Sequence, residues 1–213
     1  MLSFEHKSHS IKLPKNKILR SEMKLVGKGT DREVFYPPDY PAILFKVLLP
    51  VGRIETGGLK GWMIKNFPSL RSRAILGEYK SAIQIQIVKN KKRQGDIPIS
   101  RLYGFIETDI GYASIVERIY CEDKEIGPNL RNLYESGSLT KEHIELLNDF
   151  SARLRYWRVR TTDLCIDNVV YGTSRGRPQF VLVDGIGDNF VIPLRTWSLF
   201  VTERSNNKRL EKN

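Results

Sequence analysis

The sequence predicts an α+β fold with a small, β-rich N-terminal part and a mainly helical C-terminal part. Short runs of β-branched and aromatic residues at 25–35 and 42–49 predict strands near the start of the chain. Apolar residues at helical spacing in 140–157 follow Thr140, a residue suited to a helix N-cap, with Glu142 in the first turn. Two further β-type runs, 168–171 and 179–183, come after this helix and predict a hairpin.

The segment 25–35 is expected to form a strand, a glycine turn and a second strand. Backbone N–H groups at Gly27 and Gly29 can approach phosphates because no side chain intervenes. These glycines are also compatible with an ordinary hairpin, and Arg32 stands where the G-x-G-x-x-G pattern has its third glycine. Gly29 follows Lys28, so the segment is not a Walker A loop.

Lys46 interrupts the apolar run 42–49. A buried strand rarely holds an ammonium group unless the group reaches a partner or water, although lysines at sheet edges are common. The expected partner is Glu78, in a predicted helix at 70–87 with Ala74 and Ile75 on its apolar face. A glutamate on a helix is more often solvated, so the predicted pairing of Lys46 with Glu78 is supported only by the neighbouring motifs.

Asp163, Asn168 and Asp184 form the most informative constellation of the sequence. Pairing of the strands that follow Asn168 and precede Asp184, across a loop expected at 172–178, brings these two residues together. Their side-chain oxygens suit Mg²⁺, and Asp163 in the preceding loop could accept a proton as the catalytic residue. The alternative is a hairpin that ends in Asn and Asp because both residues suit turns.

Taken together, these parts follow the order found in protein kinases, which predicts a bilobal, protein-kinase-like fold. The expected division is a basic leader at 1–20, an N-lobe at about 21–119 that includes the helix with Glu78, and a reduced C-lobe at about 120–213. The backbone at Glu117 and Ile119 would meet an adenine edge, unless 114–117 is simply another half-buried strand.

The chain resembles the bacterial PhoP regulatory network protein family, often called YrbL, within the protein-kinase-like superfamily. The resemblance covers about 25–197 and is clearest in Asp184-Gly185-Ile186-Gly187-Asp188 and in 192–198. It implies that Lys46 contacts the α- and β-phosphates of ATP and pairs with Glu78, and that Asn168 and Asp184 hold Mg²⁺.

The resemblance also implies departures from active kinases. Thr161 and Thr162 replace the His-Arg before the catalytic Asp163, Cys165 stands where a lysine often lies, and Gly185-Ile186 replaces Phe-Gly. The chain has no Ala-Pro-Glu segment after Asp184 and little length there to dock a polypeptide. We therefore expect a small-molecule phosphotransferase, whose acceptor the sequence does not identify, or an inactive pseudokinase.

The formal net charge of +11 supports a competing hypothesis, a basic nucleic-acid-binding regulatory protein. Basic residues cluster at 89–93, and arginines alternate with aromatic residues at 153–160, a pattern that can bind single strands. The second cluster equally fits a helix that turns Leu154 and Trp157 towards the core. No nucleic-acid-binding motif accompanies the charge, so this hypothesis ranks second.

We expect a cytoplasmic protein. No apolar stretch reaches membrane-spanning length, and residues 1–7 lack a secretory hydrophobic region. Two cysteines are too few for a disulfide framework, and three histidines give no zinc pattern.

Overall fold

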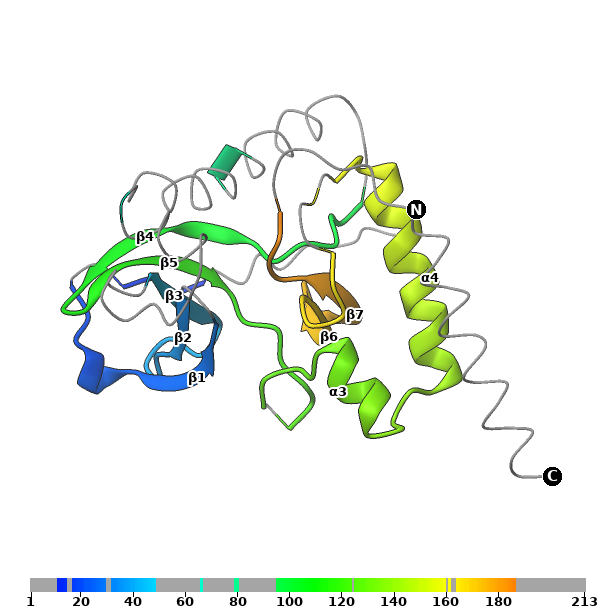
Figure 1. The fold of residues 1–213 in the computed structure, drawn as a ribbon, viewed down its shortest axis with the longest axis horizontal. Helices are drawn as coiled ribbons and strands as arrows, with labels where there is room; N and C mark the ends of the chain where they lie inside the picture. Colours follow the sequence, from blue (N-terminus) through cyan, green and yellow to red (C-terminus); the bar gives the residue numbers. More distant parts are fainter. Residues whose placement is uncertain are drawn as a thin grey trace, which may run out of the picture. The chain divides into compact units, whose positions relative to one another are not determined.

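The computed structural model describes residues 11–14, 17–29, 32–48, 66, 79–80, 95–123, 125–159, 161 and 164–186 (Figure 1). The chain has an α+β fold and divides into two compact units. The first contains the described parts of Met1–Lys65 and Tyr103–Arg118, and the second those of Asn66–Leu102 and Ile119–Asn213. The predicted limits of a leader and two kinase-like lobes stay a prediction.

The first unit is built on a five-stranded antiparallel sheet in the order β1-β2-β3-β5-β4. Its strands are β1 (Lys24–Lys28), β2 (Arg32–Tyr36), β3 (Ile43–Leu48), β4 (Leu102–Thr108) and β5 (Gly111–Glu117), preceded by a short 3₁₀ turn, η1 (Arg20–Glu22). The strands predicted at 25–35, 42–49 and 114–117 are confirmed. β4 was not predicted.

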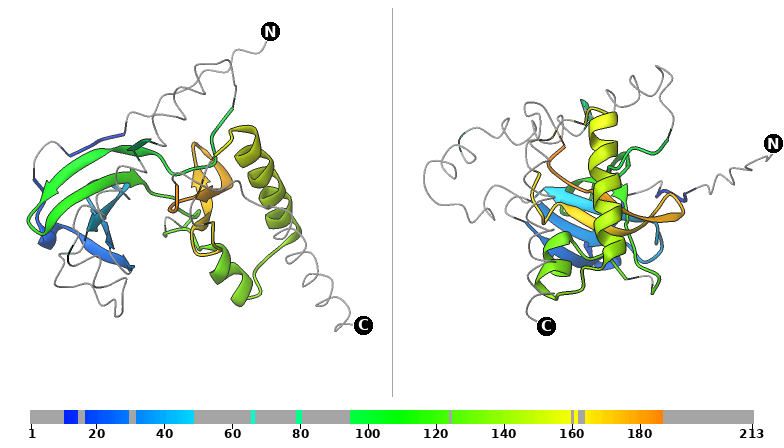
Figure 2. Two further views of the ribbon diagram at one scale, coloured as in Figure 1. Left: turned by 45° about the horizontal axis from the view of Figure 1, so that its top comes forward. Right: turned by 90° about the vertical axis from the view of Figure 1, so that its right-hand side faces the viewer.

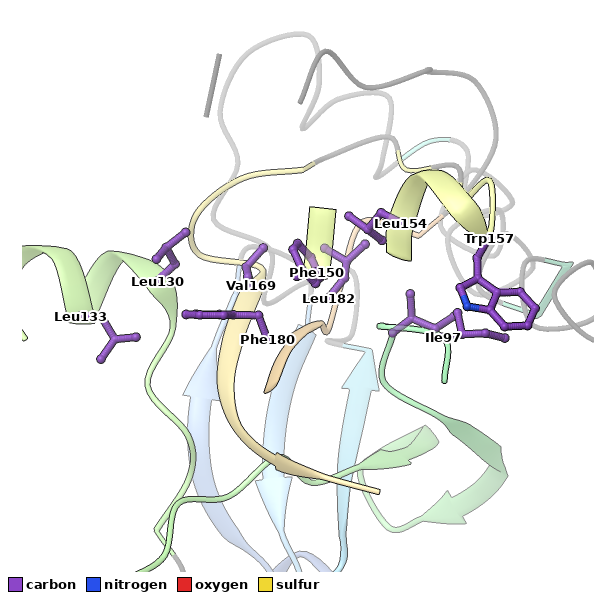
Figure 3. Packing of buried hydrophobic residues seen from close by; sticks show 10 residues of the cluster. Ile97, Leu130, Leu133, Phe150, Leu154, Trp157, Val169, Phe180 and Leu182 are labelled. Carbon is purple, nitrogen blue, oxygen red and sulfur yellow. The ribbon is translucent and has the colours of Figure 1, made fainter. Parts of the chain in front are cut away.

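The second unit contains α3 (Leu130–Glu135), α4 (Lys141–Tyr156) and a hairpin of β6 (Val169–Ser174) and β7 (Arg177–Leu182). Both views of Figure 2 show α4 lying alongside this hairpin, in agreement with the contacts between α4 and β7. Figure 3 shows the core that results, in which side chains of both helices surround those of the hairpin. Phe150 and Leu154 of α4 and Trp157 at its C-terminal end belong to the same buried cluster as the hairpin residues Val169, Phe180 and Leu182.

The helix predicted from Thr140 is confirmed. The Thr140 hydroxyl accepts a hydrogen bond from the His143 N–H at 3.2 Å, and the Thr140 N–H donates to Nδ1 of His143 at 3.1 Å. This reciprocal arrangement is a capping box in which a histidine takes the place usually held by Glu or Gln.

The hairpin predicted around Asn168 and Asp184 is also present, but its loop is shorter than the expected 172–178. Arg175 and Gly176 alone form the turn, and both have positive φ, 54° and 78°. Two central residues with positive φ make a turn whose twist matches that of the strands. Strand pairing therefore continues to Ser174 and Arg177.

A third segment pairs with β7 inside the second unit. Ile99 forms a parallel bridge with Leu182, the Ser100 N–H donates to the Leu182 carbonyl, and the Leu182 N–H donates to the Pro98 carbonyl. Nη2 of Arg175 donates to the Ile99 carbonyl at 2.9 Å. The end of β7 is thus hydrogen-bonded on both sides.

Of the longer predicted helix at 70–87, only Tyr79 and Lys80 are described, and both are helical. Within the described ranges, no helix has the length and apolar character needed to cross a membrane.

Candidate nucleotide-binding site

Lys46 lies on the central strand β3, and its side chain is only 8% exposed. It is paired with Val34 of β2 and with Ser114 of β5, while Val34 is paired with Gly27 of β1. Directly opposed residues of antiparallel strands point to the same face of a sheet. Gly27, Val34, Lys46 and Ser114 therefore form one row on one face, which we call the lysine row.

The adjacent row points to the other face of the same sheet. Phe35, Phe45 and Ile115 are opposed across β2, β3 and β5 and are buried in a core that includes Ile18 and Met23. Since successive residues of a strand alternate between faces, this core lies opposite Lys46. The sheet thus separates an apolar core from a face that presents an ammonium group and a hydroxyl.

The glycines of the β1–β2 segment are not required by close packing. The register of β1 on β2 shifts between Leu25 and Gly27. A Cβ atom added to Gly27 would meet Cβ of Val34 at 3.6 Å, an ordinary van der Waals contact, and one on Gly29 would lie 3.4 Å from the Arg32 carbonyl oxygen. The fold therefore accepts a side chain at Gly27, and packing among the described residues does not explain the glycine.

Glu117 ends β5 opposite Ile43 and is buried. The next residue, Arg118, donates its backbone N–H to the Ala42 carbonyl, and its guanidinium lies 4.4 Å from the ring centroid of Tyr36. Nη1 of Arg118 also donates to the Pro41 carbonyl at 3.1 Å. These contacts fix the end of β5, which carries a predicted adenine-contacting residue.

Ile119 belongs to the second unit and lies against β6. The Ile119 carbonyl accepts from the Gly127 N–H at 3.0 Å, and the Tyr120 carbonyl accepts from the Thr173 N–H at 2.7 Å. A Cβ atom on Gly172 would come within 2.7 Å of that Tyr120 oxygen and 3.0 Å of Cγ2 of Ile119. Ile119 and Tyr120 therefore pack on Gly172 of β6 at a distance that only glycine permits.

Asn168 and Asp184 lie at the open end of the β6–β7 hairpin. The Val183 N–H donates to the Asn168 carbonyl at 2.9 Å, so Asn168 is bonded to the residue adjacent to Asp184. Oδ1 of Asp184 accepts from the Gly185 N–H at 2.8 Å, and Gly185 has a positive φ of 73°. Both Asn168 and Asp184 are half-buried.

An antiparallel bridge joins Thr161 to Ile186. It brings the chain two residues before position 163 beside the chain two residues after Asp184. Thr161 is almost fully buried, so this junction is part of the packed interior.

The donor set at the hairpin end fits Mg²⁺. Asn and Asp supply oxygen atoms, which hard cations prefer, and Mg²⁺ needs few protein ligands because phosphates and waters complete its octahedron. Within the described ranges, no group of three or more His, Cys, Asp and Glu residues forms a closed metal site.

Two predicted site residues, Glu78 and Asp163, lie outside the described residues. The pairing of Lys46 with Glu78 and the convergence of Asp163 on Asn168 and Asp184 remain predictions. The described part places Gly27 and Lys46 in one row of the first unit, with Val34 between them, and bonds Asn168 to the residue before Asp184 in the second.

Sequence reasoning did not single out Ser114 as a neighbour of Lys46, because β3 and β5 pair across a long stretch of chain. It also missed an ion pair between Arg131 and Asp167, the residue before Asn168. The motif around Asn168 included Asp167, but nothing local in the sequence indicates its partner.

The fold and the site define an α+β protein with a buried lysine on the central strand of a sheet, and with Asn168 and Asp184 at the open end of a hairpin. The profile of the family described as PhoP regulatory network protein YrbL matches residues 18–212, and the chain belongs to this family. A comparison with curated proteins found no match.

Proposed function

We propose that this protein binds ATP with Mg²⁺ in the manner of protein kinases. The observation that carries the proposal is the hairpin that brings Asn168 beside the residue preceding Asp184. The kinase pattern requires these two side chains on one metal ion. The description of the family refers to a regulatory network and does not identify a ligand.

The lysine row gives independent support. Lys46 is buried on a central strand, and its face holds Gly27, where the fold itself does not demand a glycine. In the proposed site, Lys46 neutralises the α- and β-phosphates, and the backbone near Gly27 and Gly29 approaches them. Glu117 and Ile119 offer backbone groups to the adenine, and Glu78 orients Lys46.

When bound, Mg²⁺ would neutralise phosphate charge and hold the phosphate chain in one geometry. Asn168 and Asp184 would supply its protein oxygens, with the Gly185 N–H holding Oδ1 of the carboxylate. In a catalytically active form, Asp163 positions the hydroxyl of a small-molecule acceptor. In a pseudokinase, ATP and Mg²⁺ bind and stabilise the protein, and no phosphate is transferred.

A thermal-shift titration with ATP and MgCl₂ tests the proposal. Ligand at 100 times its Kd stabilises a protein by about 2.7 kcal/mol, which raises the Tm of a protein of this size by roughly 5–10 °C. Asp184→Ala should abolish the Mg²⁺-dependent part of the shift, while Asp39→Ala, in an exposed turn, should not change it. An undiminished shift in Asp184→Ala would refute the assignment.

Gly27→Ala tests the first unit without disturbing its packing. Its Cβ has ordinary space beside Val34, so the Tm without ligand should change little. The added methyl group keeps phosphates away from the backbone, so the ATP response should weaken. Exposed Lys28→Ala on the same strand is the matched control, and equal responses in both variants would argue against phosphate binding here.

Release of ADP and phosphate under saturating ATP and Mg²⁺ distinguishes a phosphotransferase from a pseudokinase. A phosphotransferase hydrolyses ATP slowly even without its acceptor, and Asp163→Asn should abolish that activity. A pseudokinase gives the same ATP-induced stabilisation and no product in either protein.

The described part of the arginine-rich segment does not favour nucleic-acid binding. Trp157 is only 2% exposed and packs in the core, so it cannot stack on a base. Arg153 donates to Oε1 of the buried Gln179 and pairs with Asp149. Arg153 and Trp157, two members of the pattern that suggested a stacking surface, are therefore structural.

A further inference from the structure

Arg131 of α3 and Asp167 form a two-point ion pair in the second unit. Nε of Arg131 lies 2.6 Å from Oδ1 of Asp167, and Nη2 lies 2.8 Å from Oδ2. Two parallel N–H···O bonds between a planar guanidinium and a carboxylate fix the orientation of both groups, which a single contact does not. This pair joins a helix to the turn that precedes β6.

The helix end that carries Arg131 is firmly held. Asn129 caps α3 through its side chain, and Leu130 is buried in the core. The Tyr171 N–H of β6 donates to the Pro128 carbonyl at 2.9 Å, immediately before the cap. The N-terminal end of α3, which carries Arg131, is therefore already hydrogen-bonded to β6.

The other partner, Asp167, is the residue before Asn168. The Asn168 N–H donates to the Cys165 carbonyl at 3.1 Å and closes a turn, while the Asn168 carbonyl accepts from Val183. These two bonds hold the backbone of Asn168. The pair with Arg131 adds a third restraint, which acts on the turn from the side of α3.

The exposure of the pair limits what it contributes to overall stability. Side chains of Arg131 and Asp167 are 46% and 44% exposed. Solvent-exposed ion pairs contribute little to folding, because water and salt screen the two charges. The pair therefore has little effect on whether the chain folds, and its consequence is local: it limits the motion of the turn that carries Asn168.

We propose that Arg131 is a positioning residue for the cation site, acting through Asp167 to hold Asn168 in the orientation that binds Mg²⁺. This inference rests on the proposed function and extends it by a residue from a separate helix. Residues that orient metal ligands typically change metal affinity by about 10–100-fold when they are removed. We expect an effect near the lower end, because two backbone bonds also hold Asn168.

The experiment measures the Mg²⁺ concentration that gives half of the ATP-induced thermal shift. Arg131→Gln should raise that concentration roughly 10-fold while changing the Tm without ligand by no more than about 2–4 °C. Arg131→Lys, which makes only a single-point contact, should give an intermediate value. The shift produced by ATP in EDTA should be the same in all of these proteins.

Asp167→Asn should reproduce the effect of Arg131→Gln, and the double variant should be no worse than either single one, because all three remove the same contact. Lys17→Gln is the matched control. It breaks an exposed pair with Glu107 in the first unit, at 3.2 Å, and should leave the Mg²⁺ requirement unchanged.

The outcomes separate the two ideas. If the unmodified protein shows no response to ATP with Mg²⁺, the proposed function fails and the role of Arg131 fails with it. If the unmodified protein responds and Arg131→Gln has the same Mg²⁺ requirement, only the positioning role is overturned. A large fall in the Tm of both Arg131→Gln and Arg131→Lys without ligand would likewise overturn it, because the pair would then be a general structural brace.

Discussion

Gly172→Ala should destabilise this protein more than any exposed substitution in the same hairpin. Gly172 has φ +156°, a conformation that side chains rarely adopt, and its added Cβ would lie 2.7 Å from the Tyr120 carbonyl oxygen. The strained backbone costs about 1–3 kcal/mol. Loss of the Thr173–Tyr120 hydrogen bond as the backbone moves adds about 0.5–1.5 kcal/mol.

The expected loss is therefore about 1.5–4.5 kcal/mol, or a fall in Tm of roughly 3–18 °C. Gly176→Ala is the control, since Gly176 also has positive φ but nothing lies within 4 Å of its added Cβ. It should cost only about 1–2 kcal/mol. Denaturant unfolding of the three proteins measures the difference.

Equal losses in Gly172→Ala and Gly176→Ala would refute the reasoning, because backbone conformation alone would then explain both. The comparison also bears on the proposed site. The clash displaces Ile119 and Tyr120, so ATP binding, measured by isothermal titration well below the Tm, should weaken in Gly172→Ala and persist in Gly176→Ala.

Three further outcomes follow from the structure. Burial holds the pKa of His143 below its ordinary value against a smaller opposing effect of Glu142, so the unfolded chain takes up the proton first. The contribution of His143 to the unfolding free energy should be complete above about pH 6.5 and fall as the pH drops through the lower folded pKa. His143→Gln keeps an acceptor for the Thr140 N–H but does not titrate, so this part of the pH dependence should vanish in that variant. Gln179→Leu should cost about 2–4 kcal/mol, because it removes a buried acceptor from Arg153, and chemical denaturation would measure the loss. Arg155→Ala should leave ATP binding unchanged, and a loss of ATP response in a titration at two salt concentrations would contradict a nucleotide site that does not include the arginine-rich segment.

The elements that the sequence predicted are those whose signals are local. Thr140 and the apolar spacing behind it determine where α4 begins, and the side chains around Val169 and Phe180 identify the hairpin. The hairpin loop was predicted too long because Gly172 and Pro178 suggested a turn. Gly172 instead remains in β6 because the backbone of Tyr120 packs against it, a contact from a distant segment that composition cannot reveal.

The candidate site was predictable to the extent that it depends on one hairpin. Pairing of two adjacent strands was enough to place Asn168 near Asp184. The position of Ser114 beside Lys46 depends on β3 pairing with β5, and the restraint on the turn before Asn168 depends on Arg131 of α3. Both require the tertiary fold, so no spacing rule along the chain indicates them.

The hairpin links the stability of the second unit to the geometry of the proposed metal site. Val169, Phe180 and Leu182 are fully buried at its centre, and the strands that carry them end within two residues of Asn168 and Asp184. A ligand pair attached to the most deeply packed strands is held in place before any ion arrives, which lowers the cost of binding. Substitutions in this core would change folding and ion affinity together, because both depend on the same packing. Exposed groups such as Arg131 are therefore the more informative sites to alter, since their effect on Mg²⁺ binding is separable from their effect on folding.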